Sequence, residues 1–85
     1  MKVELKVLVE DATLRRGFIA EHGLSVFLEA EHEDGSKVTL LLDVGATGDV
    51  LLHNAEKLSV PLENVDAVVL SHGHYDHTGG LLKLL

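Results

Sequence analysis

The sequence predicts an α/β fold, and three of its features lead to that prediction. Charged and apolar residues alternate over residues 2–9, which is the period of a half-buried strand. Two further apolar segments are separated by Asp34-Gly35, a strong signal for a β-hairpin. A helical pattern then precedes the uninterrupted apolar run at 67–70. Such a run is typical of a strand inside a sheet that helices cover.

The first three strands are expected at residues 2–9, 24–32 and 37–43. In the first of them, one face carries four apolar side chains: Val3, Leu5, Val7 and Val9. Between the first two strands, residues 10–23 show no clean period and are expected to form a long loop. Loops of this length in a small domain are often functional.

A helix is expected next, because glycines break the sheet after the third strand. Thr47 or Asp49 is suited to capping its amino end. Its stripe consists of Val50, Leu51, Asn54, Ala55 and Leu58. Pro61 is expected to end the helix, because the residue before a proline is disfavoured in helical geometry. The last strand, at 66–70, is expected to be covered on both faces, and Gly79-Gly80 leads into a further helix.

Composition restricts the chain to one small domain with an aliphatic core. Its 85 residues allow one domain at most, and only 4% are aromatic, so aliphatic side chains must form the core. Cysteine is absent, which excludes disulfides and thiolate metal ligands. A net charge of −7 argues against a nucleic-acid or anionic-membrane surface. With no signal-peptide pattern and no apolar run near the roughly 20 residues of a spanning helix, a cytoplasmic protein is expected.

Three histidines and one aspartate are concentrated directly after the last predicted strand, in the sequence His72-Gly73-His74-Tyr75-Asp76-His77. Imidazole nitrogen and carboxylate oxygen suit borderline divalent metals, zinc first and manganese or iron next. Alternate residues of an extended segment point the same way, so His72 and His74 are placed to bind one ion. Asp76 and His77 follow where the chain turns toward a second position. The motif therefore predicts one or two divalent metal ions.

This His-x-His-x-Asp-His pattern, with Thr78-Gly79-Gly80-Leu81 after it, resembles the signature of the metallo-β-lactamase superfamily. The upstream Leu41-Leu42-Asp43-Val44-Gly45 resembles the Asp-x-Gly element that ends a strand in that superfamily. Residues 17–25 and 71–81 are similar to a branch of metal-dependent hydrolases that includes dihydropterin-related ribofuranosyl-aminobenzene phosphate synthases. The resemblance implies a four-layer αββα sandwich, and residues 1–85 would be its amino-terminal part, a single partial domain.

The resemblance also implies a site and a reaction. His72 and His74 would hold the first metal, and Asp76 and His77 the second. A metal-bound hydroxide would attack an ester or phosphoester-type small molecule, itself phosphorylated in some branch members. Asp76 would be the catalytic residue that orients the hydroxide and accepts its proton. The family's remaining ligands, two histidines and a bridging aspartate, lie beyond the equivalent of Leu85, so the site is expected to be incomplete.

Four residues are candidates for supporting roles, each with a plainer alternative: Asp43, His22, Arg15 and Arg16. Asp43 either caps a local turn or fixes the metal loop by holding a loop amide or a histidine's other ring nitrogen. His22 is either a plain loop histidine or, from its match to the branch, a substrate contact or proton donor. The two arginines are either solvated or clamp a substrate phosphate. His32 and His53 are expected at the surface.

Two other classes of function remain open for this chain. One is a metal-binding module without turnover, which predicts a single bound metal and no catalysis. The other is a structural fragment whose apolar surface drives self-association regardless of metal. Under every hypothesis, the large aliphatic content predicts a homo-oligomer or association with the missing half of the fold. A small-molecule substrate is the other expected partner, and neither nucleic acid nor a membrane is.

Overall fold

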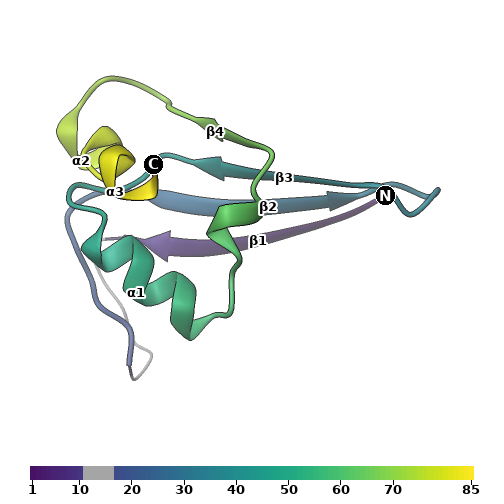
Figure 1. Ribbon diagram of the computed structural model, residues 1–85, viewed down its shortest axis with the longest axis horizontal. Coiled ribbons are helices and arrows are strands. Elements are labelled where there is room, and N and C mark those ends of the chain that lie inside the picture. The colour runs from purple at the N-terminus through teal and green to yellow at the C-terminus, as the bar shows by residue number, and fades with distance from the viewer. Residues whose placement is uncertain (11–16) are drawn as a thin grey trace.

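The computed structural model describes residues 1–10 and 17–85. In chain order its elements are β1 (Lys2–Val9), β2 (Ser25–Glu31), β3 (Lys37–Leu42), α1 (Asp49–Lys57), the 3-10 helix η1 (Leu62–Asn64), β4 (Ala67–Val69), α2 (Tyr75–Thr78) and α3 (Leu81–Leu84), as Figure 1 shows. Within this part of the chain, no helix has the length and apolar character that crossing a membrane requires. A mixed sheet with helices confirms the predicted α/β class.

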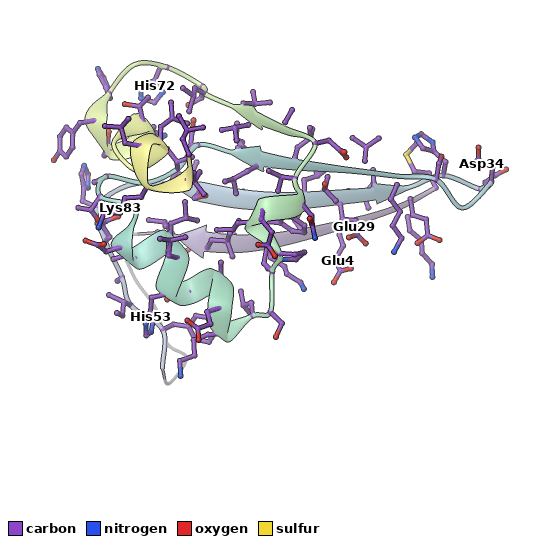
Figure 2. All side chains as sticks on the ribbon, in the orientation of Figure 1. Glu4, Glu29, Asp34, His53, His72 and Lys83 are labelled. Carbon is purple, nitrogen blue, oxygen red and sulfur yellow. The ribbon has the colours of Figure 1, made fainter. Side chains whose placement is uncertain are left out.

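The strands form one sheet in the order β1-β2-β3-β4, antiparallel except for the parallel pair β3 and β4. The β2–β3 hairpin closes at the predicted turn, where Gly35 has a φ of 90°, a conformation that favours glycine. Because β3 and β4 are parallel, their carboxyl ends reach the same edge of the sheet. His72 lies at this end of the molecule and Asp34, at the hairpin tip, lies at the opposite end (Figure 2).

Helix α1 packs against one face of the sheet and completes the core. The buried apolar cluster consists of Leu8, Val9, Phe27, Leu41, Val44, Leu51, Ala55, Val60 and Leu62. Asn54 is buried in the helix and donates its side-chain amide to the carbonyls of Leu8, at 2.7 Å, and Ile19, at 2.8 Å. These two bonds attach the helix to the end of β1 and to the loop before β2.

The ends of α1 differ in part from the prediction. At the amino end, the Asp49 amide donates to Oγ1 of Thr47 at 3.2 Å, while Gly48 occupies the cap position itself with a φ of 88°. At the carboxyl end the helix stops at Lys57, before Pro61 is reached. Ser59 has a φ of 57°, a left-handed conformation that cannot continue a helix. The proline was therefore the wrong reason for the end of this helix.

The four apolar residues predicted to share one face of β1 do not all lie on that face. Val3, Leu5 and Val7 are 57%, 61% and 48% exposed, whereas Val9 is completely buried. A register shift between Val7 and Val9 marks a β-bulge, which lets Leu8 and Val9 both enter the core. The prediction that all four valines and leucines share one face was wrong for Val9.

The sheet face opposite α1 is apolar from one edge to the other, and we call it the open face. Cross-strand pairing places eleven side chains on it: Val3, Leu5, Val7, Val26, Leu28, Ala30, Val38, Leu40, Leu42, Ala67 and Val69. All are exposed or half-buried. The prediction that β4 is covered on both faces was wrong for the described residues, because Val68 and Val69 are 36% and 44% exposed on an edge strand.

We expect the open face to make the chain self-associate, because eleven adjacent apolar side chains form a patch of the kind that marks interfaces. Leu5→Glu places a charge at the middle of β1 on this face and should shift the chain toward monomer. Leu82→Glu, at an 84% exposed position on α3, is the matched control and should change nothing. Sedimentation velocity at micromolar concentration measures both. A compact wild-type monomer would contradict the expectation.

Candidate metal centre

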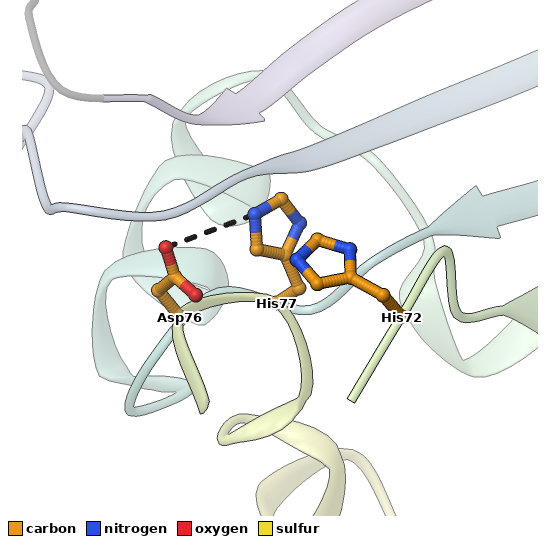
Figure 3. A group of neighbouring side chains, drawn as sticks. All are labelled: His72, Asp76 and His77. Atoms are coloured by element: carbon orange, nitrogen blue, oxygen red, sulfur yellow. Dashed lines mark ion pairs between the residues drawn. The ribbon is translucent and has the colours of Figure 1, made fainter. Parts of the chain in front are cut away.

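The predicted metal motif lies at the edge where the carboxyl ends of β3 and β4 meet. The chain leaves β4 after Val69, and His74 precedes α2 in an extended conformation, with φ −67° and ψ 142°. The single turn of α2 then brings Asp76 and His77 beside His72 (Figure 3). A short strand, a loop and one helical turn therefore build the site.

Three motif residues form a group suited to a metal ion: His72, Asp76 and His77. One ligand atom from each lies within 4.8 Å of the others. Nε2 of His77 is 3.7 Å from Oδ2 of Asp76, and both side chains are largely shielded, with 19% and 16% exposure. Ligands bound at about 2.1 Å from one zinc ion lie no more than about 4.2 Å apart. The separations in the group, none above 4.8 Å, are therefore close to those of a zinc shell, and small side-chain movements would bring all three atoms within reach of one ion.

His74 is exposed, and its ring lies beside this group. Its centroid is 4.6 Å from that of His72 in an edge-on arrangement, while the His72 and His77 rings are 4.2 Å apart. In the structure, His72 forms the group with Asp76 and His77. From the sequence we instead expect His72 and His74 to bind one ion, because alternate residues of a strand point the same way. The difference arises because α2 starts directly after His74 and turns the following residues inward.

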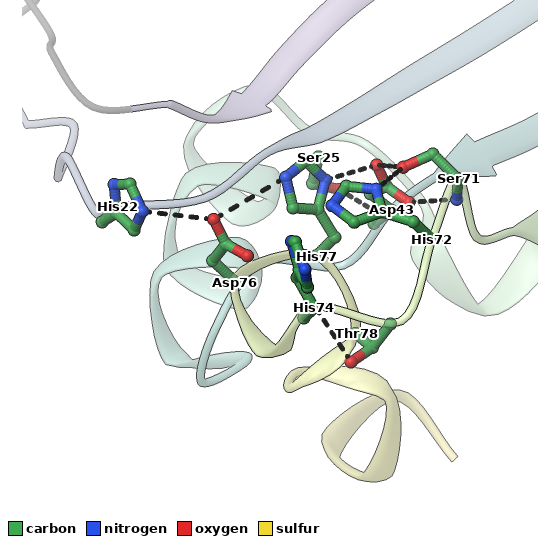
Figure 4. A network of polar contacts seen from close by, with 9 residues as sticks. All are labelled: His22, Ser25, Asp43, Ser71, His72, His74, Asp76, His77 and Thr78. Atoms are coloured by element: carbon green, nitrogen blue, oxygen red, sulfur yellow. Dashed lines mark hydrogen bonds and ion pairs between the residues drawn. The ribbon is translucent and has the colours of Figure 1, made fainter.

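Asp43 lies beneath the motif and is completely buried. Its Oδ1 accepts a hydrogen bond from the Ser71 amide at 2.7 Å, and its Oδ2 accepts from the Ser71 hydroxyl and from Nδ1 of His77, each at 2.7 Å (Figure 4). Burial raises the pKa of the Asp43 carboxyl, but the Ser71 amide, His77 and the Ser71 hydroxyl outweigh burial and hold that pKa below its ordinary value. The carboxylate is therefore a charged acceptor that holds two residues of the metal loop.

The backbone explains why Asp43 reaches the loop. It follows the last residue of β3, and its amide donates to the Val69 carbonyl at 2.8 Å, which extends the parallel pairing by one residue. Its φ of 57° is left-handed, a conformation that aspartate tolerates better than most residues. The next amide, that of Val44, donates to the His77 carbonyl at 2.8 Å. Side-chain and backbone bonds therefore link the end of β3 to the same turn of α2.

The loop before β2 contacts the motif from the other side. Nε2 of His22 is 3.2 Å from Oδ2 of Asp76, while the His22 side chain is 71% exposed. The Leu24 amide donates to the Asp76 carbonyl at 3.3 Å. Glu21, which the sequence did not single out, accepts from the Ala46 amide and the Thr47 hydroxyl, at 3.2 and 2.8 Å. These contacts place His22 at the open side of the group.

Two arginines and two other histidines were also named from the sequence. Arg15 and Arg16 lie outside the described residues. His53 is on α1, where its Nε2 is 2.7 Å from the Gly17 carbonyl, and His32 lies at the hairpin turn, so neither reaches the motif. Ser71, directly before the motif, also escaped the sequence prediction. Its position next to a ligand was the only available signal, because its contacts with Asp43 depend on the tertiary fold.

The donor set suits a divalent metal. Two imidazoles and one carboxylate are ligands that zinc, manganese and iron accept. Nδ1 of His77 is bonded to Asp43 and Nδ1 of His72 is 2.8 Å from the Ser71 hydroxyl, so Nε2 is the ring nitrogen left for a metal in both residues. Histidine ligands in metalloproteins are commonly held in this way through the other ring nitrogen.

Comparison with known protein families agrees with this geometry. A sequence model of the metallo-beta-lactamase superfamily matches residues 20–85. The match covers most of the chain, including the Asp43 element and the whole motif. The chain belongs to the metallo-β-lactamase superfamily, as its motifs indicated, and members of this superfamily characteristically carry divalent metals.

Individual proteins of known name are also similar to this chain in sequence. The chain is 34% identical over 84 residues to 7,8-dihydropterin-6-methyl-4-(beta-D-ribofuranosyl)-aminobenzene-5'-phosphate synthase of Methanocaldococcus jannaschii, covering 98% of this chain and 28% of the synthase. It is 46% identical over 46 residues to the anti-Pycsar protein Apyc1 of Paenibacillus sp., covering 54% of this chain and 18% of that protein. The chain thus spans less than a third of the length of either relative.

Gly79, directly after α2, lies close to the backbone of Ala46, and the effect of this close packing on stability can be tested. A Cβ on Gly79 would overlap the carbonyl oxygen of Ala46, whereas a Cβ on Gly73 would meet nothing within 4 Å. We expect Gly79→Ala to lower the free energy of unfolding by about 1–3 kcal/mol, the usual cost of overpacking. Gly73→Ala should stay within about 0.5 kcal/mol of wild type. Urea unfolding followed by circular dichroism at one protein concentration measures both, and equal losses would contradict the packing argument.

Proposed function

We propose that this chain forms the metal-binding amino-terminal part of a metal-dependent hydrolase, or related synthase, with a four-layer αββα sandwich fold. The observation that carries the proposal is the group formed by His72, Asp76 and His77, with Nε2 of both histidines left for a metal. The described residues supply one sheet and one helical layer of that sandwich. The remaining layers and ligands would come from the rest of the family domain.

The proposed ligands are the four residues of the motif: His72, His74, Asp76 and His77. His74 belongs in the set because its ring already lies against that of His72, next to the group of three. Zinc is the first choice of metal because nitrogen outnumbers oxygen among these ligands, and manganese or iron is the second. Whether one or two ions bind depends on the ligands that the remainder of the domain contributes.

Asp76 is the proposed catalytic residue. A divalent ion bound at the motif would lower the pKa of a coordinated water toward about 7 and make it a nucleophile at neutral pH. The Asp76 carboxylate lies between Nε2 of His22 and Nε2 of His77, 3.2 and 3.7 Å away, so two rings hold its orientation. These contacts support the proposed role of Asp76, which would orient the attacking water and accept its proton.

We propose an ester or phosphoester-type small molecule as the substrate. The name of the archaeal synthase includes a 5'-phosphate, and this is the reason to expect a phosphorylated compound. His22 is exposed beside Asp76, which makes it the candidate in the described residues for touching that substrate. Arg15 and Arg16 stay proposed contacts for a phosphate group, from their charge and from their place in the sequence, a few residues before His22.

Zinc binding should depend on the motif and not on the other histidines. Replacing His72 or His74 by alanine removes a proposed ligand, and we expect the dissociation constant for zinc to rise at least tenfold. His53→Ala is the matched control, because His53 lies on α1 away from the group, and it should leave the affinity unchanged. Calorimetric titration of each variant with zinc gives the constants. Equal losses in all three variants would disprove the assignment.

Turnover should require more than this chain. Shared between two ions, the four motif residues give each ion two protein ligands, whereas catalytic zinc usually has three. The attacking water must also be placed accurately, because errors of about 1 Å can cost on the order of a hundredfold in rate. We therefore expect the 85-residue chain with zinc or manganese to hydrolyse simple esters and phosphodiesters barely faster than the free ion. The complete family domain should be active, and Asp76→Ala should abolish that activity.

The turnover assay also separates the alternatives. Tight metal binding with no hydrolysis by the complete domain would support a binding module and overturn the hydrolase proposal. Robust hydrolysis by the 85-residue chain that is lost in Asp76→Ala would show that a neighbouring copy supplies the remaining ligands. In that case the expectation of an incomplete site would be wrong.

A further inference from the structure

We propose that Ser71 is a positioning residue that fixes the tautomer of His72, so that one buried carboxylate, Asp43, prepares both His72 and His77 to bind a metal through Nε2. The inference rests on the proposed metal site, and it assigns a role to a residue outside the motif. The carboxylate acts on His77 by direct contact and on His72 through the Ser71 hydroxyl.

The tautomer of His72 follows from a count of the hydrogens around the Ser71 hydroxyl. The Ser71 hydroxyl has one hydrogen, and its oxygen lies 2.7 Å from Oδ2 of Asp43 and 2.8 Å from Nδ1 of His72. An ionised carboxylate only accepts hydrogen bonds, so Ser71 must give its hydrogen to Asp43. The Ser71 oxygen can then only accept from His72. Nδ1 of His72 therefore carries the proton, and Nε2 keeps the lone pair that a metal needs.

The same reasoning applies to His77 without an intermediary. Its Nδ1 is 2.7 Å from Oδ2 of Asp43, the same oxygen that receives the Ser71 hydrogen. Since that oxygen is an acceptor, Nδ1 of His77 carries a proton, and in the neutral ring Nε2 then keeps its lone pair. Nε2 of His77 points toward Asp76, at 3.7 Å. Two rings thus take the same tautomer because both depend on one carboxylate oxygen.

The position of Ser71 is itself well defined. Its amide donates to Oδ1 of Asp43 at 2.7 Å while its hydroxyl donates to Oδ2, so backbone and side chain bind the two oxygens of one carboxylate. Replacing the hydroxyl by hydrogen keeps the amide bond to Oδ1 and removes both bonds of the hydroxyl, the one to Oδ2 of Asp43 and the one that links it to His72. Threonine offers the same hydroxyl and should restore the link. Ser71→Ala and Ser71→Thr therefore separate the hydroxyl from the backbone contact.

Histidine tautomers can be read directly, without metal and without catalysis. In the apo chain labelled with 15N-histidine at pH 8, long-range 1H–15N correlations report which ring nitrogen is protonated. We expect His72 and His77 to be protonated at Nδ1 in wild type. Ser71→Ala should shift His72 toward Nε2 protonation and leave His77 unchanged, and Ser71→Thr should match wild type.

A second readout is zinc affinity. Loss of a hydrogen-bond partner of a ligand typically weakens metal binding 10–100-fold, so Ser71→Ala should raise the zinc dissociation constant by about tenfold. Ser71→Thr should stay close to wild type. Ser36→Ala is the matched control, because Ser36 bonds Asp34 through both amide and hydroxyl in the hairpin, far from the motif.

Two results would overturn the inference: His72 protonated mainly at Nε2 in the wild-type chain, or an unchanged His72 tautomer in Ser71→Ala. The first needs no variant, so a poorly folding mutant does not remove the test. A wild-type chain that fails to bind zinc while showing the expected tautomers would count against the proposed metal site and would leave the Ser71 assignment supported.

Discussion

The geometry of the metal motif depends on the buried carboxylate of Asp43. Apolar packing does not order the loop that it holds, because His72 and His74 are exposed and no apolar side chain of the loop is buried. Backbone bonds from Val44 and Leu24 reach the α2 end of the motif and not Ser71 or His72. Three hydrogen bonds from Ser71 and His77 converge on the carboxylate, all at 2.7 Å. A buried charge without such partners would be strongly destabilising, so the carboxylate and the loop stabilise each other.

Two features of the described residues support the proposed remainder of the domain. The open face carries eleven apolar side chains that no other described element covers, and the metal motif lies at the edge of the same sheet with three candidate ligands close together. The chain spans 28% of the archaeal synthase to which it is similar. A second sheet that covers the open face would also be well placed to deliver further ligands to that edge, which unites the fold proposal with the site proposal.

Local patterns predicted the hairpin and three long strand segments, because alternation and Asp34-Gly35 are visible in a few residues. The spacing of His72, Asp76 and His77 likewise identified the side chains that the structure groups together. Contacts between segments that lie far apart in the sequence could not be predicted from such local patterns. The bulge before Val9 has no recognisable sequence pattern. The left-handed backbone of Ser59 has none either. The grouping of His72 with Asp76 and His77 depends on where α2 begins. The bonds of Ser71 exist only once β3 and β4 pair.

The most direct test of this account is the zinc affinity of Asp43→Asn, an isosteric change that removes the charge and one acceptor oxygen. Asp49→Asn, at an exposed position on α1, is the matched control. With the fold retained by circular dichroism, the account predicts a zinc dissociation constant at least tenfold higher for Asp43→Asn and unchanged for Asp49→Asn. A folded Asp43→Asn chain that binds zinc as tightly as wild type would contradict it.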